Sequence, residues 1–204
     1  MTKLIIVRHG ETTWNLEHRA QGSKNIGLTK NGLNQAKLLA KRLKHYKIDK
    51  IYSSDLDRAF HTAEMVAKEL DQEVIKDNRL REMSFGKWEG LTTSEIKEKY
   101  EDDFIIWRNN PHKALIPEAE KLVDVQNRTL EIINYIIKEN KGKTILIVSH
   151  GISIKSIILG IMEMPLSDFY KITQNNTSIN IIEYRDYGPV IKTLNDTAHL
   201  ENIE

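Results

Sequence analysis

Leu4-Ile5-Ile6-Val7-Arg8-His9-Gly10 begins the fold with an unbroken apolar run that ends in an arginine, a histidine and a glycine. Uninterrupted apolar runs of this length are typical of strands that are buried on both faces of a sheet. The same pattern returns in Ile145-Leu146-Ile147-Val148-Ser149-His150-Gly151. Polar residues at the carboxyl ends of such strands occupy the usual ligand position of open α/β sheets. The two stretches therefore predict two imidazoles that face one site.

The composition is that of a soluble globular protein with one full core. Its 204 residues are 40% hydrophobic and 29% charged, and 30 Lys and Arg balance 29 Asp and Glu. This balance gives no net field that would favour nucleic acid or a membrane surface. The absence of cysteine excludes disulfides, thiol catalysis and cysteine-based zinc sites. Because no signal peptide or membrane-spanning run is recognisable, we expect one cytoplasmic domain over residues 1–204.

Strand and helix patterns alternate along the chain. Strands are expected over residues 4–7, 51–54, 74–76, 145–149, 178–184 and 190–194. Helices are expected around residues 33–43, 58–70, 92–100, 104–108, 120–139 and 152–162, and residues 12–30 and 79–91 are expected to be irregular. Ser54 or Asp55 is expected to cap the helix that contains Arg58. This alternation predicts an α/β fold with a mostly parallel central sheet.

The polar residues near the two strand ends are suited to holding a phosphate group. Arg8 and Arg58 offer planar guanidinium groups that match phosphate geometry, and helix starts near Arg58 and Gly151 would add free N–H groups. His9 can act as a nucleophile if its ring is neutral and one nitrogen donates to a nearby acceptor. His150 is then expected to be a cationic partner that stabilises charge on the transferring phosphoryl group.

Glu82 is the carboxylic acid best placed in the sequence to protonate a leaving oxygen. Burial near Met83 and Phe85 would favour the protonated acid that this role needs, whereas Arg79 and Arg81 would oppose it. A structural role is the alternative, with Glu82 as the ion-pair partner of one of these two arginines. The residues alone leave both interpretations open.

The remaining histidines and aromatic residues have simpler interpretations. Five histidines show no spacing typical of metal ligands, and we expect no metal site: His18, His45, His61, His112 and His199. Phe85, Trp88 and Trp107 are expected to form core or pocket wall.

An ordered set of motifs accompanies these residues. It comprises Arg8-His9-Gly10-Glu11-Thr12, Asn15, Gln21-Gly22, Leu28-Thr29, Gly32, Gln35-Ala36, Ser53-Ser54-Asp55-Leu56, Arg58-Ala59, Thr62-Ala63, Arg81-Glu82, Phe85-Gly86, Trp88-Glu89-Gly90 and Ser149-His150-Gly151. In this order the set resembles the histidine phosphatase superfamily, the phosphoglycerate mutase-like proteins, over nearly the whole chain. The resemblance is greatest to the small bacterial broad-specificity and α-ribazole phosphatases. It implies a three-layer sandwich with helices on both faces of the sheet.

The resemblance also implies a phosphohistidine mechanism that needs neither metal nor cofactor. His9 would be phosphorylated, and Glu82 would be the acid and later the base that activates water. The phosphate pocket would be completed by Arg8, Arg58 and His150. Auxiliary contacts would come from Thr12, Asn15 and the Gly151 amide, with Gln21 and Gly22 at the substrate mouth.

Two segments depart from the family pattern. Ala119-Glu120-Lys121 stands where the family often has Gly-Glu-Ser, so the contacts of that loop are open. Asn25 and Gly27 replace the usual Asp and Pro before Leu28-Thr29, which changes the rigidity of that loop more than its chemistry.

Hydrolases and mutases of this family share phosphoryl transfer to the histidine. They differ in whether water or a second substrate oxygen then accepts the group. Mutases usually contain a longer insertion after the Glu82 region, whereas residues 92–117 supply only a small cap here. We therefore expect a phosphomonoester hydrolase for small phosphorylated metabolites, with no nucleic-acid or membrane partner. A cofactor-dependent phosphoglycerate mutase and a catalytically silent phospho-ligand binding module are the alternatives. The sequence fixes neither the leaving group nor the oligomeric state.

Overall fold

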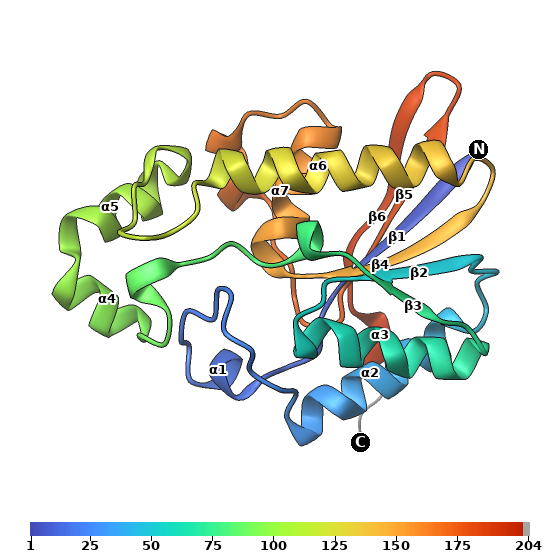
Figure 1. Ribbon diagram of the computed structural model, residues 1–204, viewed down its shortest axis with the longest axis horizontal. Coiled ribbons are helices and arrows are strands. Elements are labelled where there is room, and N and C mark those ends of the chain that lie inside the picture. Colours follow the sequence, from blue (N-terminus) through green and yellow to red (C-terminus); the bar gives the residue numbers. More distant parts are fainter. Residues whose placement is uncertain (202–204) are drawn as a thin grey trace.

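The computed structural model describes residues 1–201, and its centre is a six-stranded sheet (Figure 1). Its strands lie in the order β3 (Val74–Lys76), β2 (Lys50–Ser53), β4 (Thr144–Ser149), β1 (Thr2–Arg8), β5 (Ile179–Arg185) and β6 (Gly188–Asp196). The first four run parallel, β5 is antiparallel to β1, and β6 is antiparallel to β5. The mostly parallel sheet is thus confirmed, with a hairpin at one edge.

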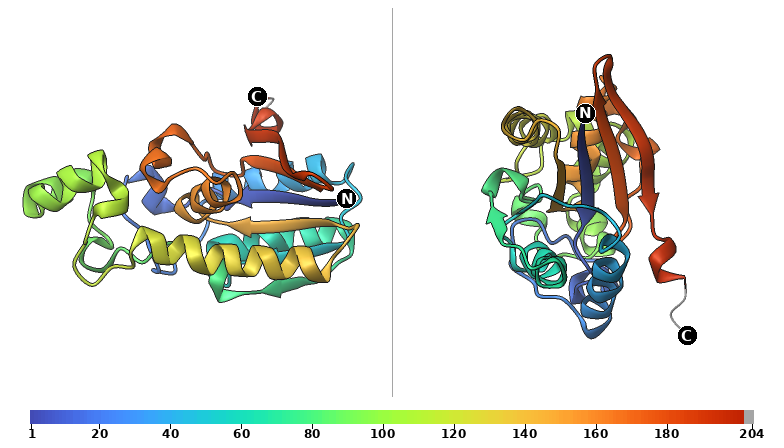
Figure 2. Two further views of the ribbon diagram at one scale, coloured as in Figure 1. Left: turned by 90° about the horizontal axis from the view of Figure 1, so that it is seen from above. Right: turned by 90° about the vertical axis from the view of Figure 1, so that its right-hand side faces the viewer.

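Helices cover both faces of the sheet, which confirms the three-layer sandwich (Figures 1 and 2). One face packs against α2 (Lys30–Leu43) and α3 (Asp57–Leu70), and the other against α6 (Leu122–Glu139) and α7 (Gly151–Ile161). Successive side chains of a strand point to opposite faces. Leu4 and Ile6 accordingly join the core under α6 and α7, and Ile5 and Val7 join the core under α2 and α3. Because both faces of β1 pack against a helix layer, residues 4–7 are all apolar.

The two histidine-glycine strands are direct neighbours. In the parallel pair of β1 and β4, Arg8 lies opposite Ser149, and the His9 amide donates to the Ser149 carbonyl at 3.0 Å. His9 and His150 therefore leave the sheet side by side at its carboxyl edge, as the sequence predicts.

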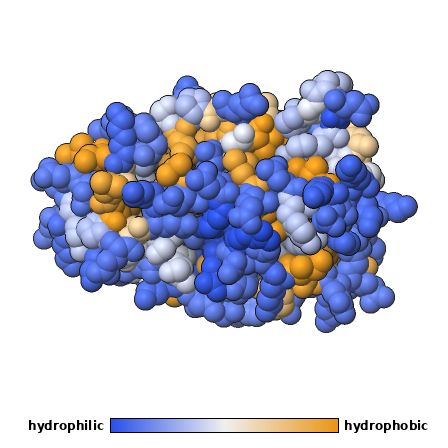
Figure 3. All heavy atoms as spheres, turned by 45° about the horizontal axis from the view of Figure 1, so that its top comes forward, coloured by the Kyte–Doolittle hydropathy of each residue, from blue (hydrophilic) through white to orange (hydrophobic). Residues whose placement is uncertain are grey.

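Residues 92–117 contain α4 (Thr93–Lys99), α5 (Glu101–Asn109) and the short 3-10 helix η3 (Pro111–Lys113). These helices project from the end of the molecule opposite the β5–β6 hairpin (Figure 1). The surface in Figure 3 is mostly hydrophilic, with several hydrophobic patches, one of which lies at the end where α5 lies. Ile105 and Ile106 of α5 are 48% and 40% exposed. In the described part of the chain, no helix has the length and apolarity needed to cross a membrane.

Short helical turns occupy the connecting segments. They are α1 (Thr13–Leu16) and the 3-10 helices η1 (Asn78–Leu80), η2 (Gly86–Trp88), η4 (Leu166–Lys171) and η5 (Ala198–Leu200). The presence of α1 corrects the expectation of a loop throughout residues 12–30. Thr12 caps this turn and forms a capping box with Asn15, a local signal that the apolar periodicity does not reveal.

The expected cap of α3 is wrong. Its N-cap residue is Leu56, which makes no side-chain cap bond, and the Asp57 amide instead donates to Asn25 Oδ1 at 2.8 Å. Ser54 is engaged with His150, and Asp55 forms an ion pair with Arg81. Both polar side chains are thus committed to the carboxyl edge of the sheet, and a residue from a distant loop satisfies the helix start.

Candidate active site

A cavity of about 150 Å³ opens at the carboxyl edge of β1. It is lined by Arg8, His9, Asn15, Arg19, Ala20, Gln21, Gly22, Arg58, Glu82 and Phe85. We call it the phosphate cavity. Three further predicted residues lie beside it rather than in its wall. His150 is buried behind His9, Gly151 lines a neighbouring cavity, and Thr12 is buried under Asn15.

The His9 ring has the geometry of a neutral nucleophile. It is 2% exposed, and Nδ1 lies 2.7 Å from the Gly10 carbonyl oxygen. A carbonyl only accepts, so Nδ1 holds the proton and Nε2 keeps its lone pair. Burial, with the positive charges of Arg58 and Arg8, lowers the pKa of His9 well below its ordinary value of 6.5. The ring is therefore neutral at pH 7.

The His150 ring lies beside that of His9, and its role as a cationic partner of the transferring phosphoryl group stays a prediction. Its ring centroid lies 5.2 Å from that of His9, and Nε2 is 2.8 Å from Ser54 Oγ. Burial lowers the pKa of His150 well below 6.5, and Arg58, His9 and Arg8 add to this effect. Protonating His150 would add a positive charge beside two buried arginines, which is unfavourable without a neighbouring anion. Its buried Nδ1 has no hydrogen-bond partner among the described residues.

Three arginines line the phosphate cavity, of which Arg19 forms ion pairs with Glu17 and Glu95, and Arg8 and Arg58 form none among the described residues. Arg58 is fully buried and donates to the carbonyls of Lys24 and Gly22 at 2.7 and 2.8 Å. Burial lowers the pKa of Arg58 to about 10, so it stays cationic at pH 7. Arg8 donates to the Gln174 carbonyl at 2.7 Å. The Nε atoms of both arginines are buried and have no hydrogen-bond partner in the described structure.

Glu82 is held at the start of α7 by backbone N–H groups. Oε1 accepts from the amides of Met83 and Ser153 at 3.0 and 3.2 Å, and Oε2 accepts from the Ile152 amide at 3.2 Å. The carboxyl group is thus fixed at the wall of the phosphate cavity. An acid or base must be positioned in this way to exchange a proton with a bound substrate.

The alternative ion-pair role of Glu82 is wrong. Arg79 pairs with Asp77 and with Glu131, and Arg81 pairs with Asp55. Neither guanidinium contacts the Glu82 side chain, although both residues are close to it in the sequence. This leaves the Glu82 carboxyl group available for the cavity.

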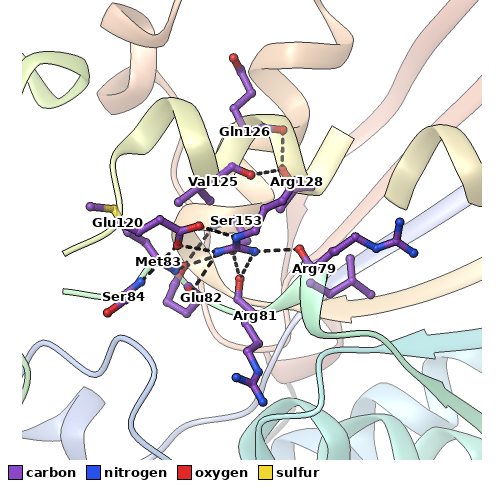
Figure 4. A network of polar contacts seen from close by, with 12 residues as sticks. Arg79, Arg81, Glu82, Met83, Ser84, Glu120, Val125, Gln126, Arg128 and Ser153 are labelled. Carbon is purple, nitrogen blue, oxygen red and sulfur yellow. Dashed lines mark hydrogen bonds and ion pairs between the residues drawn. The ribbon is translucent and has the colours of Figure 1, made fainter. Parts of the chain in front are cut away.

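Arg128 of α6 holds the segment around Glu82 in place (Figure 4). Its guanidinium donates to the carbonyls of Arg79, Arg81 and Glu82 at 2.7, 2.8 and 3.2 Å. The Glu120 carboxylate binds the same guanidinium at 2.6 and 2.9 Å. The Ala119-Glu120-Lys121 loop, which differs from the family pattern, therefore contributes its glutamate to this arrangement. The motifs do not indicate Arg128, because a helix arginine that binds carbonyls has no distinctive pattern.

Replacing Arg128 tests this positioning role. Arg128→Lys is expected to lower kcat for alkyl phosphomonoesters by about 10- to 100-fold, because a displaced acid transfers its proton poorly. The decrease in kcat for p-nitrophenyl phosphate is expected to be smaller, because nitrophenolate can leave with little help from proton transfer. Steady-state kinetics on both esters measure the difference. Arg79→Lys, whose side chain pairs elsewhere, is the control, and equal losses on both esters would indicate a purely structural role for Arg128.

Asn15 is oriented by neighbours that the motifs only partly reveal. Its Oδ1 accepts from the Thr12 amide at 3.0 Å and from Asn176 Nδ2 at 3.3 Å. Asn176 also donates to the His9 carbonyl at 3.0 Å. With Oδ1 occupied, the Asn15 amide nitrogen is the group left for an anion in the phosphate cavity.

Gln21 and Gly22 line the phosphate cavity, and their place at the substrate mouth stays a prediction. Gly22 has φ 52°, and a Cβ there would lie 2.1 Å from Glu89 Oε1. A glycine is needed because the chain turns tightly here to present its carbonyl to Arg58. The buried Gln21 Oε1 has no partner in the described structure.

Comparisons with known proteins agree with this geometry. Residues 4–197 match the model of the histidine phosphatase superfamily (branch 1). Phosphoserine phosphatase 1 of Hydrogenobacter thermophilus is 37% identical over 98% of this chain and 95% of its own. A chain named probable phosphoglycerate mutase GpmB, from Escherichia fergusonii, is 32% identical over 98% of this chain and 96% of its own. A crystal structure of a phosphoserine phosphatase mutant from Entamoeba histolytica, in complex with phosphoserine, superposes with a TM-score of 0.89. It is 36% identical and covers 98% of this chain and 100% of that one.

Proposed function

The chain belongs to the histidine phosphatase superfamily, branch 1, and we propose that it hydrolyses phosphomonoesters of small metabolites through a phosphohistidine on His9. One observation supports this most strongly: a neutral His9 with a free Nε2 lines the same cavity as Arg8, Arg58 and Glu82. The binding partner proposed for this cavity is a small-molecule phosphomonoester.

The first step transfers the phosphoryl group to the enzyme. Arg8 and Arg58 bind the phosphate oxygens, and His9 Nε2 attacks phosphorus in line with the ester oxygen. The N–P bond forms as the P–O bond breaks, and protonated Glu82 gives its proton to the leaving oxygen.

The second step releases phosphate. Glu82, now a carboxylate, takes a proton from a water molecule, which attacks phosphorus. The N–P bond breaks, inorganic phosphate leaves, and His9 and protonated Glu82 are restored. Arg8 and Arg58 supply the positive charge that metal ions supply in many phosphoryl-transfer enzymes.

Phosphate release from a panel of phosphomonoesters tests this proposal directly. We expect turnover of p-nitrophenyl phosphate and of several small metabolite esters, with the same rates after addition of a chelator. Loss of activity with the chelator would contradict the metal-independent mechanism. Absence of turnover with every ester would favour the binding-module alternative.

The mutase alternative predicts a different product. Such an enzyme would isomerise 3-phosphoglycerate, with bisphosphoglycerate present, much faster than it releases inorganic phosphate. The relative from Hydrogenobacter thermophilus is a phosphatase by name, and the cap over residues 92–117 contains only the short helices α4, α5 and η3. We therefore expect phosphate release to exceed isomerisation.

The pH profile of kcat/KM follows from the state of His9. Burial and two adjacent arginines lower the pKa of His9 well below 6.5, and only the neutral ring attacks. The reactive form therefore persists as the pH falls through 6.5, and the acid limb due to His9 lies below this value. Kinetics from about pH 5 to about pH 8, corrected for ionisation of the ester at about pH 6, measure this limb. An acid limb with its midpoint at 6.5 or above would contradict the assignment.

A further inference from the structure

A second cavity adjoins the phosphate cavity. Its volume is about 310 Å³, and it shares Arg8, Glu82 and Phe85 with the first. Its remaining wall comes from α5, α7, η4 and residues 173–174. Glu82, the proposed proton donor, therefore lies at the boundary between the two cavities. A leaving group whose oxygen is protonated by Glu82 would extend into the second cavity.

Two cations line the second cavity, Arg108 from α5 and Lys155 from α7. Lys155 Nζ lies 4.5 Å from the ring centroid of Phe169, and Arg108 Cζ lies 5.4 Å from that of Tyr170. Tyr170 is tied in turn to the cap, because its hydroxyl donates to the Trp107 carbonyl at 3.0 Å. Contacts of this kind orient a cation without neutralising it.

No carboxylate in residues 1–201 forms an ion pair with either cation. Lys155 is half-buried, and its pKa is lowered by burial and by Arg8, with an opposing contribution from Glu82. Holding a partly buried charge without a counter-ion is unfavourable. An anionic ligand group would relieve this cost.

We propose that the second cavity is the leaving-group subsite, and that Arg108 and Lys155 bind an anionic group on the alcohol portion of the substrate. This inference rests on the proposed phosphatase function. The cavity wall also includes Phe85, Trp107 and Phe169, which suit a short carbon skeleton between the ester and the second charge. The expected substrates are phosphate esters of hydroxy acids, or esters with a second phosphate, rather than esters of neutral alcohols.

Matched ester pairs test the subsite. O-phosphoserine and O-phosphoethanolamine differ by one carboxylate, and fructose 1,6-bisphosphate and fructose 6-phosphate differ by one phosphate. We expect kcat/KM of the unaltered enzyme to favour the more acidic member of at least one pair by about tenfold or more, as charged hydrogen bonds do. The pair with the larger preference identifies the anion as carboxylate or phosphate.

Lys155→Met is expected to reduce the kcat/KM preference for the more acidic ester by about tenfold, mainly by raising KM for that ester. The double variant Lys155→Met with Arg108→Met is expected to abolish the preference. Lys97→Met is the control, because this exposed lysine of α4 lines neither cavity and should keep the original preference. Equal kcat/KM within both pairs, or variants that lower both members of a pair alike, would overturn the subsite. In those cases turnover of p-nitrophenyl phosphate persists and the proposed function stands. Absence of turnover with every ester would overturn both.

Discussion

His9→Ala is expected to lower kcat by about 10⁴-fold or more, as removal of an enzyme nucleophile does. The substitution removes Nε2, while Arg8 and Arg58 still bind the ester. His150 lies 5.2 Å away between ring centroids, but it is buried behind His9 and does not line the phosphate cavity. It is therefore not placed to attack instead. Phosphate release from p-nitrophenyl phosphate measures the effect.

His61→Ala is the matched control for His9→Ala. His61 is an exposed histidine of α3 whose ring lies 3.8 Å from the Glu64 carboxylate, outside the phosphate cavity. We expect this variant to retain the activity of the unaltered enzyme. A melting curve for His9→Ala separates lost chemistry from lost folding. Comparable activity of the two variants would contradict the role of His9.

Glu82→Gln is expected to have the second largest effect. The amide keeps the shape of the side chain but has no acidic proton to give, and a general acid contributes about 10²- to 10⁴-fold. Turnover of alkyl phosphomonoesters is expected to fall by that factor. With p-nitrophenyl phosphate the first step needs little proton transfer, so a burst of nitrophenol should precede a slow steady state.

The burst distinguishes the two roles assigned to Glu82. If it acts as acid and later as base, the variant completes the first step with p-nitrophenyl phosphate and stalls before water attack. Rapid-mixing kinetics measure the burst amplitude, which is expected to approach one per active site. Unchanged steady-state turnover of an alkyl ester would contradict both roles. A steady state without a burst would contradict the role as base.

The parts of the fold that depend on local pattern are predictable from the sequence. The unbroken apolar runs at residues 4–7 and 145–148 predict buried neighbouring strands, and the structure pairs them with Arg8 opposite Ser149. Helical periodicity likewise locates α2, α6 and α7 close to their observed bounds. Such patterns succeed because burial on one or both faces dictates the residue type.

Features that depend on tertiary contacts are not predictable in this way. Ser54 looks like a helix cap in the sequence, but the folded chain brings His150 to its hydroxyl. Burial and the neighbouring cations lower the pKa of His150, an effect that no sequence motif expresses. Arg128 contacts the Glu82 carbonyl across 46 positions of the chain, and Arg108 and Lys155 line one cavity although they lie on different helices. Residues that act through such contacts become visible only when the elements are assembled.

Direct detection of the phosphoenzyme is the sharpest test of the mechanism. The enzyme is mixed with p-nitrophenyl phosphate, quenched in alkali within the first turnover, and digested for mass spectrometry. We expect acid-labile, alkali-stable phosphate on the peptide that contains His9, in greater amount in Glu82→Gln and absent from His9→Ala. Turnover without phosphate on His9, or with phosphate on another residue that persists in His9→Ala, would contradict the mechanism.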